Sequence, residues 1–193
     1  MKNNFPCVMK TTAAITGAIT VVLALLDHIL SDDWLLTAAI STGTTCYHFA
    51  MRLLVGYLMP PVKGTSRWFR PWAWEAPVYR FLGVKSWKKH LPTYAPRQFS
   101  LAENTPEQVL RNMCGAEIVH EGIMVCSFLP LLTVPQFGAF WVFFITSTLA
   151  ALFDSLFVMT QRYNRPRLER ILKKKEASAR EQHPMHCGAD SRR

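Results

Sequence analysis

Glu117 and His120 are the pair of residues in this sequence most suited to proton transfer. They are three positions apart, so a helix would bring their side chains within reach of each other. A carboxylate beside an imidazole fixes the ring tautomer and raises its basicity, so the pair predicts a general base. The alternative is that both side chains are merely solvated where a helix crosses the membrane interface. The Glu-x-x-His step occurs once, whereas carboxylate di-iron bundles use it twice, so we expect no metal.

A basic segment, QRYNRPR, follows the last apolar stretch of the chain. The guanidinium groups of Arg162, Arg165 and Arg167 are suited to binding phosphate or carboxylate. Asn164 and Pro166 are expected to interrupt the helix and turn these arginines toward one spot, where they would bind substrate. The alternative is a segment that only fixes orientation, because arginines commonly follow transmembrane helices.

Three further polar residues lie within apolar stretches, where polar groups are costly and are retained mainly for function. His48 and Arg52 are one helical turn apart, and they either contact substrate or join two helices. Asp154 is expected to be the counter-ion of Arg52 or of Arg162. These groups are predicted to converge with His120 at one depth near the membrane interface.

An aromatic and basic loop at about 62–104 separates the second and third apolar stretches. Its many aromatic residues predict anchors in the headgroup layer. Glu75 needs a cationic partner there, for which we expect one of the nearby lysines. Trp87 and Lys88 belong to a segment, 83–92, that could shape a mouth over an active site, and both are expected to bind substrate, with Lys88 or Lys89 stabilising an oxyanion.

Half of the 193 residues are hydrophobic and only 18% are charged, compared with roughly 25% in soluble proteins. Four apolar stretches are long enough to cross about 30 Å of hydrocarbon. The prediction is an all-α integral membrane protein with a single membrane-embedded domain, 1–176, and a polar disordered tail, 177–193. Its transmembrane helices are expected at about 11–30, 34–59, 117–134 and 138–160. A capping box from Thr105 to Gln108 predicts that the third helix begins before its spanning part.

The basic residues predict the orientation of the chain. They outnumber the acidic ones by 22 to 13, and they gather before the first stretch, in the 62–104 loop and after the fourth stretch. The positive-inside rule then places both termini and the loop in the cytoplasm of a bacterial plasma membrane, with several passes across it. Such a charge balance indicates anionic membrane lipids as partners, not nucleic acid. We found no glycine-rich loop for a nucleotide, so no cofactor is expected.

Four blocks of this sequence carry a resemblance to a known family. They are the aromatic segment around Glu75, the block of Val84, Trp87 and Lys88 with Leu91-Pro92, the Ala116-Glu117-x-x-His120 step, and QRYNRPRL at 161–168. In these blocks the chain resembles the glycosyl-4,4'-diaponeurosporenoate acyltransferases, small membrane proteins of the staphyloxanthin pathway. The resemblance implies transfer of a fatty acyl group to a sugar hydroxyl of a membrane glycolipid. The longer N-terminal half and the polar tail depart from the family pattern and leave the acceptor open.

Together these observations predict a membrane acyltransferase acting at the cytoplasmic leaflet. His120, oriented by Glu117, would deprotonate a hydroxyl on a glycolipid or glycosylated isoprenoid. The acyl donor would be acyl-CoA or another activated carrier, with the arginines holding its phosphates or the anionic head of the acceptor. The alternatives are a different lipid-modifying enzyme, of methyltransferase or reductase type, and a lipid-binding or assembly protein without catalytic activity.

Overall fold

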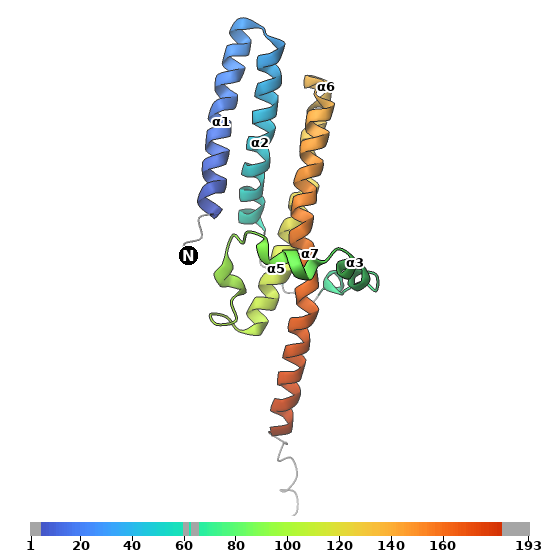
Figure 1. Cartoon of the computed structure of the whole chain (residues 1–193). Helices are drawn as coiled ribbons and strands as arrows, with labels where there is room; N and C mark the ends of the chain where they lie inside the picture. Colours follow the sequence, from blue (N-terminus) through green and yellow to red (C-terminus); the bar gives the residue numbers. More distant parts are fainter. Residues whose placement is uncertain (1–4, 60–61, 63–65, 183–193) are drawn as a thin grey trace, which may run out of the picture.

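The computed structural model describes residues 5–59, 62 and 66–182, with side chains described as far as Ser178. Over these residues the chain forms helices and no strand, which confirms the all-α class. Figure 1 shows an elongated molecule in which long helices run side by side and a set of short helices crosses them midway.

The first two helices form an antiparallel hairpin (Figure 1). Helix α1 spans Phe5–Leu30 and α2 spans Asp33–Leu58, with Asp32 capping α2 by accepting from the Trp34 N–H at 2.9 Å. Small residues let the two helices approach closely, because a side chain at Gly43 would stand 3.1 Å from Thr20. The α1 helix begins about six residues earlier than predicted, and most of its apolar side chains are exposed, as expected for a surface facing lipid.

The second half of the chain is built on two long helices, α5 and α7. Helix α5 spans Pro106–Cys126 and begins with the predicted capping box, in which Thr105 and Gln108 bond reciprocally. Short helices η4 (Leu129–Thr133) and α6 (Val134–Phe137) then lead to α7, which spans Phe140–Gln182 and packs against α5.

Helix α7 continues through Pro166, so the predicted interruption there is wrong. Proline removes one backbone hydrogen bond and crowds the preceding turn, at a cost of about 3 kcal/mol. Tertiary packing offsets this cost. Two residues beyond the proline, Leu168 is buried against Val109 and Met113 of α5. The basic segment is therefore helical and continuous with the apolar segment before it.

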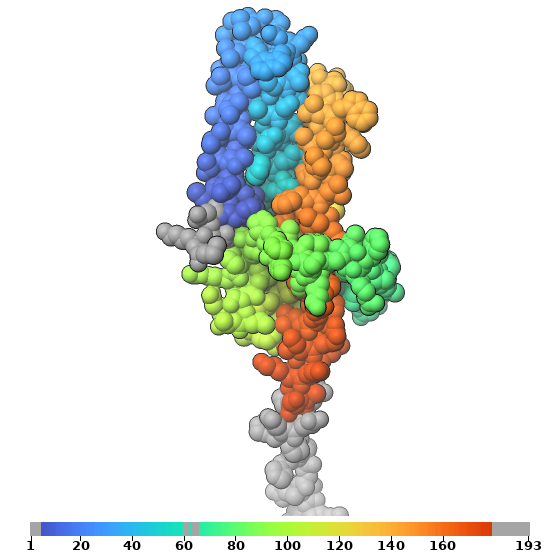
Figure 2. All heavy atoms as spheres, in the orientation of Figure 1, coloured from blue at the N-terminus to red at the C-terminus, as the bar shows by residue number. Residues whose placement is uncertain are grey.

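The loop at 66–104 folds into five short helices that cross the middle of α5 and α7 (Figure 2). They are η1 (Arg67–Phe69), α3 (Glu75–Phe81), α4 (Val84–Trp87), η2 (Lys88–His90) and η3 (Pro96–Phe99). Trp68, Trp72, Trp74 and Phe81 are exposed on this layer, as expected for side chains that anchor in headgroups.

Three helical stretches of the described chain are long and apolar enough to cross a membrane: Phe5–Leu30, Pro106–Phe137 and Phe140–Ser178. These stretches indicate a membrane protein. A fourth span, formed by α2, stays a prediction. Figure 1 shows the turns after α1 and α6 at one end of the molecule, while the 66–104 layer lies at the opposite ends of α1 and α2.

The orientation in the membrane gives a direct prediction. Reporter fusions at Ser31 to Asp33 or at 135–138 should report the outside of the cell, and fusions after Arg167 should report the cytoplasm, because the basic residues lie on that side. Paired alkaline phosphatase and green fluorescent protein fusions measure this. A cytoplasmic signal at Asp32 would contradict the model of four spans.

Candidate functional site

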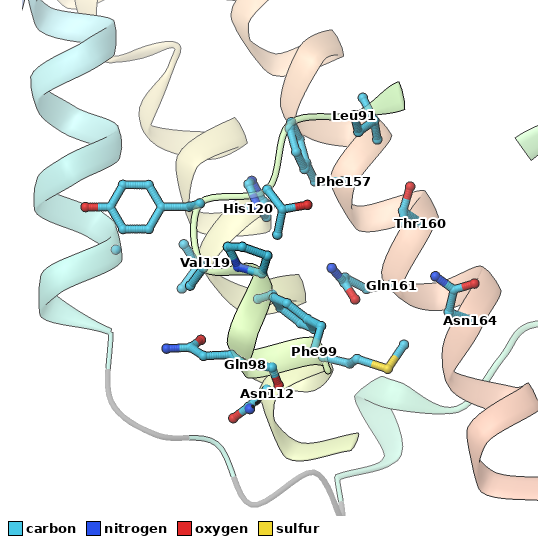
Figure 3. A pocket seen from close by; sticks show the side chains of 18 of the residues that line it. Leu91, Gln98, Phe99, Asn112, Val119, His120, Phe157, Thr160, Gln161 and Asn164 are labelled. Carbon is cyan, nitrogen blue, oxygen red and sulfur yellow. Dashed lines mark hydrogen bonds between the residues drawn. The ribbon is translucent and has the colours of Figure 1, made fainter. Parts of the chain in front are cut away.

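A large cavity lies between the two helical pairs and under the 66–104 layer. Its volume is about 1190 Å³, and its walls come from α1, α2, α5, α7 and the segment at 88–101. Figure 3 shows His120 and Asn112 of α5 on one side, with Thr160, Gln161 and Asn164 of α7 opposite. The cavity therefore joins residues that are far apart in the sequence.

His120 reaches this cavity and is held there by two residues of α7. Its Nδ1 lies 2.9 Å from Oδ1 of Asp154, and its ring stacks on Phe157 with centroids 4.5 Å apart. The Asp154 side chain is only 1% exposed, so this carboxylate is almost entirely withdrawn from solvent. With Nδ1 facing Asp154, Nε2 is the nitrogen left for a molecule in the cavity.

Arg52 is the counter-ion of Asp154, as the sequence predicted. It forms an ion pair with the second carboxylate oxygen, and it also donates to the backbone carbonyls of His48 at 3.0 Å and Ala150 at 3.2 Å. A buried carboxylate is stable in the charged form only when it is paired in this way. Arg52 thus contacts the carboxylate that lies beside His120 and joins α2 to α7.

His48 does not line the cavity, so of its two predicted roles the contact with substrate is not supported by its position. Its side chain is buried, and within the described part of the chain neither ring nitrogen has a hydrogen-bond partner. The ring instead packs edge-on against Tyr47, with centroids 5.4 Å apart. His48 and Arg52 share one face of α2, but only the longer arginine side chain reaches the cavity from that face.

Glu117 does not hold His120, and this part of the prediction is wrong. Its fully buried carboxylate accepts from Arg162 Nε at 3.0 Å and from Arg165. Residues three apart on a helix differ by about 60° around its axis, so the two side chains can diverge. Two guanidinium groups attract the carboxylate more strongly than a neutral imidazole does. Asp154 takes the place predicted for Glu117.

Glu75, Glu117, Arg162 and Arg165 together form a buried cluster, here called the carboxylate–arginine clamp. Arg162 donates to Glu75 at 3.0 Å and to the Trp68 carbonyl at 2.9 Å, while Arg165 donates to the Phe69 carbonyl. The partner of Glu75 is therefore an arginine and not the predicted lysine. The clamp ties the 66–75 segment to α5 and α7.

The clamp changes the role expected for two arginines. Among the described arginines, Arg52, Arg111 and Arg167 line the cavity, and Arg162 and Arg165 do not. Both clamp arginines already face carboxylates and carbonyls, so the prediction that they bind substrate is not supported by their geometry. Next to the clamp, burial and the neighbouring Glu75 raise the pKa of Tyr79 to about 12, which keeps this phenol protonated.

The polar end of the cavity is formed by Lys88, Asn164 and Arg167, three residues that the sequence predicted to bind substrate. Lys88 donates to the Asn164 side chain, and Arg167 donates to the Tyr163 hydroxyl at 2.6 Å. Both cations lie over the Tyr163 ring, at 4.7 Å for Lys88 and 4.2 Å for Arg167. Burial lowers the pKa of Lys88, and the nearby Arg167 charge lowers it further.

Trp87 is not among the residues that line the cavity. Its indole Nε1 donates to the Leu82 carbonyl at 2.9 Å, which closes the turn between α3 and α4. This contact holds the main chain just before Lys88. Trp87 therefore shapes the segment that carries Lys88, and the predicted contact with substrate is not supported by its position.

Comparison with protein families identifies the family to which this chain belongs. The family model for glycosyl-4,4'-diaponeurosporenoate acyltransferase matches residues 65–174, more than half of the chain. The chain belongs to this acyltransferase family. Comparisons with curated proteins and with solved structures found no match. The matched region holds the 66–104 layer, α5 and most of α7, and thus the His120–Asp154 pair, the clamp and the polar end of the cavity.

The sequence interpretation missed several polar residues in this member of the family. Thr160, Gln161 and Asn112 line the cavity but were not singled out, and Asp154 was expected only as a counter-ion. A signal was present, because Phe157, Gln161 and Asn164 recur at helical spacing. Predicting an interruption at Pro166 concealed this face of α7.

Proposed function

We propose that this protein transfers a fatty acyl group to a hydroxyl of a lipid-linked acceptor, with His120 as the general base. The observation that carries the proposal is the contact of His120 with buried Asp154 at the wall of a large cavity. Family membership supports acyl transfer as the type of reaction. The identity of the acceptor, a glycolipid or glycosylated isoprenoid at the cytoplasmic leaflet, belongs to the proposal.

In the proposed step, Nε2 of His120 takes the proton of the acceptor hydroxyl as its oxygen attacks the acyl carbonyl. Asp154 orients the ring and stabilises the imidazolium, as the carboxylate does in serine hydrolases. General-base assistance of this kind is worth about 10²- to 10⁴-fold in rate. Gln161, directed into the cavity one turn beyond Phe157, is assigned as a donor to the oxyanion (Figure 3). No acyl-enzyme is required.

The shape and lining of the cavity support a lipid-linked acceptor. Ligand pockets commonly measure roughly 300–1,000 Å³, and this cavity exceeds that range. Much of its wall is apolar and includes Met9 of α1, Leu53 of α2, Ile123 of α5 and Phe153 of α7. A hydrocarbon chain would lie against these side chains, and the polar head of the acceptor would lie beside His120.

Lipid profiling of a deletion strain tests this function. The expected result is the loss of an acylated glycolipid, with restoration by the native chain but not by His120→Ala. His90 provides a matched control, because it is exposed and lies outside the cavity lining, so His90→Ala should restore the lipid. Restoration by His120→Ala would refute the assignment of His120 as the general base.

A further inference from the structure

Two cations at the polar end of the cavity have no carboxylate partner among the residues that the structure describes. In the part of the chain that the structure describes, Arg52, Arg162 and Arg165 each pair with a buried carboxylate, whereas Lys88 and Arg167 form no ion pair. Both line the same cavity as His120, and their amide and phenol neighbours bring no negative charge. Positive charge concentrated in one cleft attracts an anionic ligand.

The position of these cations along α7 limits what the anion can be. The His120 ring stacks on Phe157, and Lys88 donates to Asn164, seven residues further along α7, so at about 1.5 Å per residue the two contacts are separated by about 10 Å along the helix axis. An anion at Lys88 therefore lies well away from the carbonyl that reacts beside His120. In a glycerophospholipid the ester carbonyls lie a few bonds from the phosphate, and in an acyl phosphate the carbonyl carbon is bonded directly to a phosphate oxygen. Neither molecule therefore spans this distance.

We propose that Lys88 and Arg167 bind the phosphates of an acyl carrier of the phosphopantetheine type, whose long arm carries the acyl thioester to His120. This inference rests on the proposed acyl transfer. Guanidinium and ammonium groups are the usual protein ligands of phosphate. Arg111, which also lines the cavity, adds a third positive charge on the side of α5. Asn112 and Asn164 also line the cavity and can bond to the amides of the arm.

The reaction balances without any further reactant. The acceptor oxygen forms a new C–O bond to the acyl carbon, and the C–S bond of the thioester breaks. His120 takes the hydroxyl proton and returns it to the departing thiolate. The products are the acylated acceptor and the free thiol of the carrier, whose phosphates remain at the polar end until it dissociates.

Titration of the purified full chain in detergent micelles with coenzyme A tests this inference. Coenzyme A should bind, and pantetheine, which lacks the phosphates, should bind much more weakly. Lys88→Ala and Arg167→Ala should each weaken coenzyme A binding about 10-fold, since each removes a charge-assisted contact. Lys85→Ala and Lys173→Ala are the matched controls, because these exposed lysines do not line the cavity, and both should bind as the native chain does.

Two comparisons separate the inference from its alternatives. His120→Ala should retain coenzyme A binding while losing turnover. If the native chain turns over another donor through His120 but does not bind coenzyme A, the carrier inference is overturned and the proposed function stands. If nanodiscs of phosphatidylglycerol abolish coenzyme A binding and nanodiscs of phosphatidylcholine do not, the two cations bind lipid headgroups, and the inference is again overturned.

Discussion

Replacing His120 with alanine is expected to lower kcat and kcat/KM together by about 10²- to 10⁴-fold. A general base acts only in the chemical step, so its removal should leave KM nearly unchanged. The variant should still fold, because His120 is partly exposed at the cavity wall and its loss leaves Asp154 paired with Arg52. Initial rates with a defined acceptor and donor, measured in membranes at matched expression, test this result.

His90→Ala is the control for this experiment, and it should retain native kinetics because the residue is exposed outside the cavity. Asp154→Asn adds a second comparison. The amide no longer stabilises the imidazolium, so kcat should fall here as well. Native turnover by His120→Ala would refute the assignment of the base.

Replacing Glu117 with glutamine is expected to reduce stability strongly. The change leaves Arg162 and Arg165 without the buried carboxylate that both contact, and breaking a buried ion pair in this way costs about 3–5 kcal/mol. For a chain of this size that corresponds to a melting temperature lower by roughly 10 °C. Size-exclusion chromatography after heating in detergent measures the shift, and Glu103→Gln, in the exposed part of the loop, should leave it unchanged.

Arg165→Lys distinguishes a structural role from substrate binding. Lysine keeps the charge, but its single ammonium group cannot reproduce the separate contacts that Arg165 makes with Glu117 and the Phe69 carbonyl. We therefore expect a lower melting temperature together with lower activity. A variant with native stability and an increased KM would instead support the original sequence prediction that this arginine binds substrate.

The helices and the candidate role of His120 were predictable because their signals are local. A capping box, a run of apolar residues or a proline acts within a few positions of the chain, so the start of α5 at Pro106 followed directly from Thr105 and Gln108. His120 was singled out because a titratable side chain in an apolar helix is costly. Family resemblance was equally visible, since its motifs are short and contiguous.

The partners of the charged residues were not predictable in the same way. Glu75, Glu117 and Asp154 compete for Arg52, Arg162, Arg165 and several lysines at similar depth, and the pairs that form join residues up to 102 positions apart. The sequence alone does not distinguish the alternative pairings of these residues, because each pairing joins one carboxylate to one cation. Helix orientation in three dimensions decides between them, and that orientation depends on packing over the whole chain.

The carboxylate–arginine clamp has a consequence for how molecules enter and leave. Swinging the 66–75 segment outward would separate Arg162 from the Glu75 carboxylate and the Trp68 carbonyl, and Arg165 from the Phe69 carbonyl. The energy required keeps the 66–75 segment fixed on α7, next to the 88–101 segment that lines the cavity. For the acyl transfer proposed above, we expect long hydrocarbon chains to enter at the first turns of α1, where Phe5 and Met9 line the cavity, and the rate of exchange to depend on the fluidity of the surrounding bilayer.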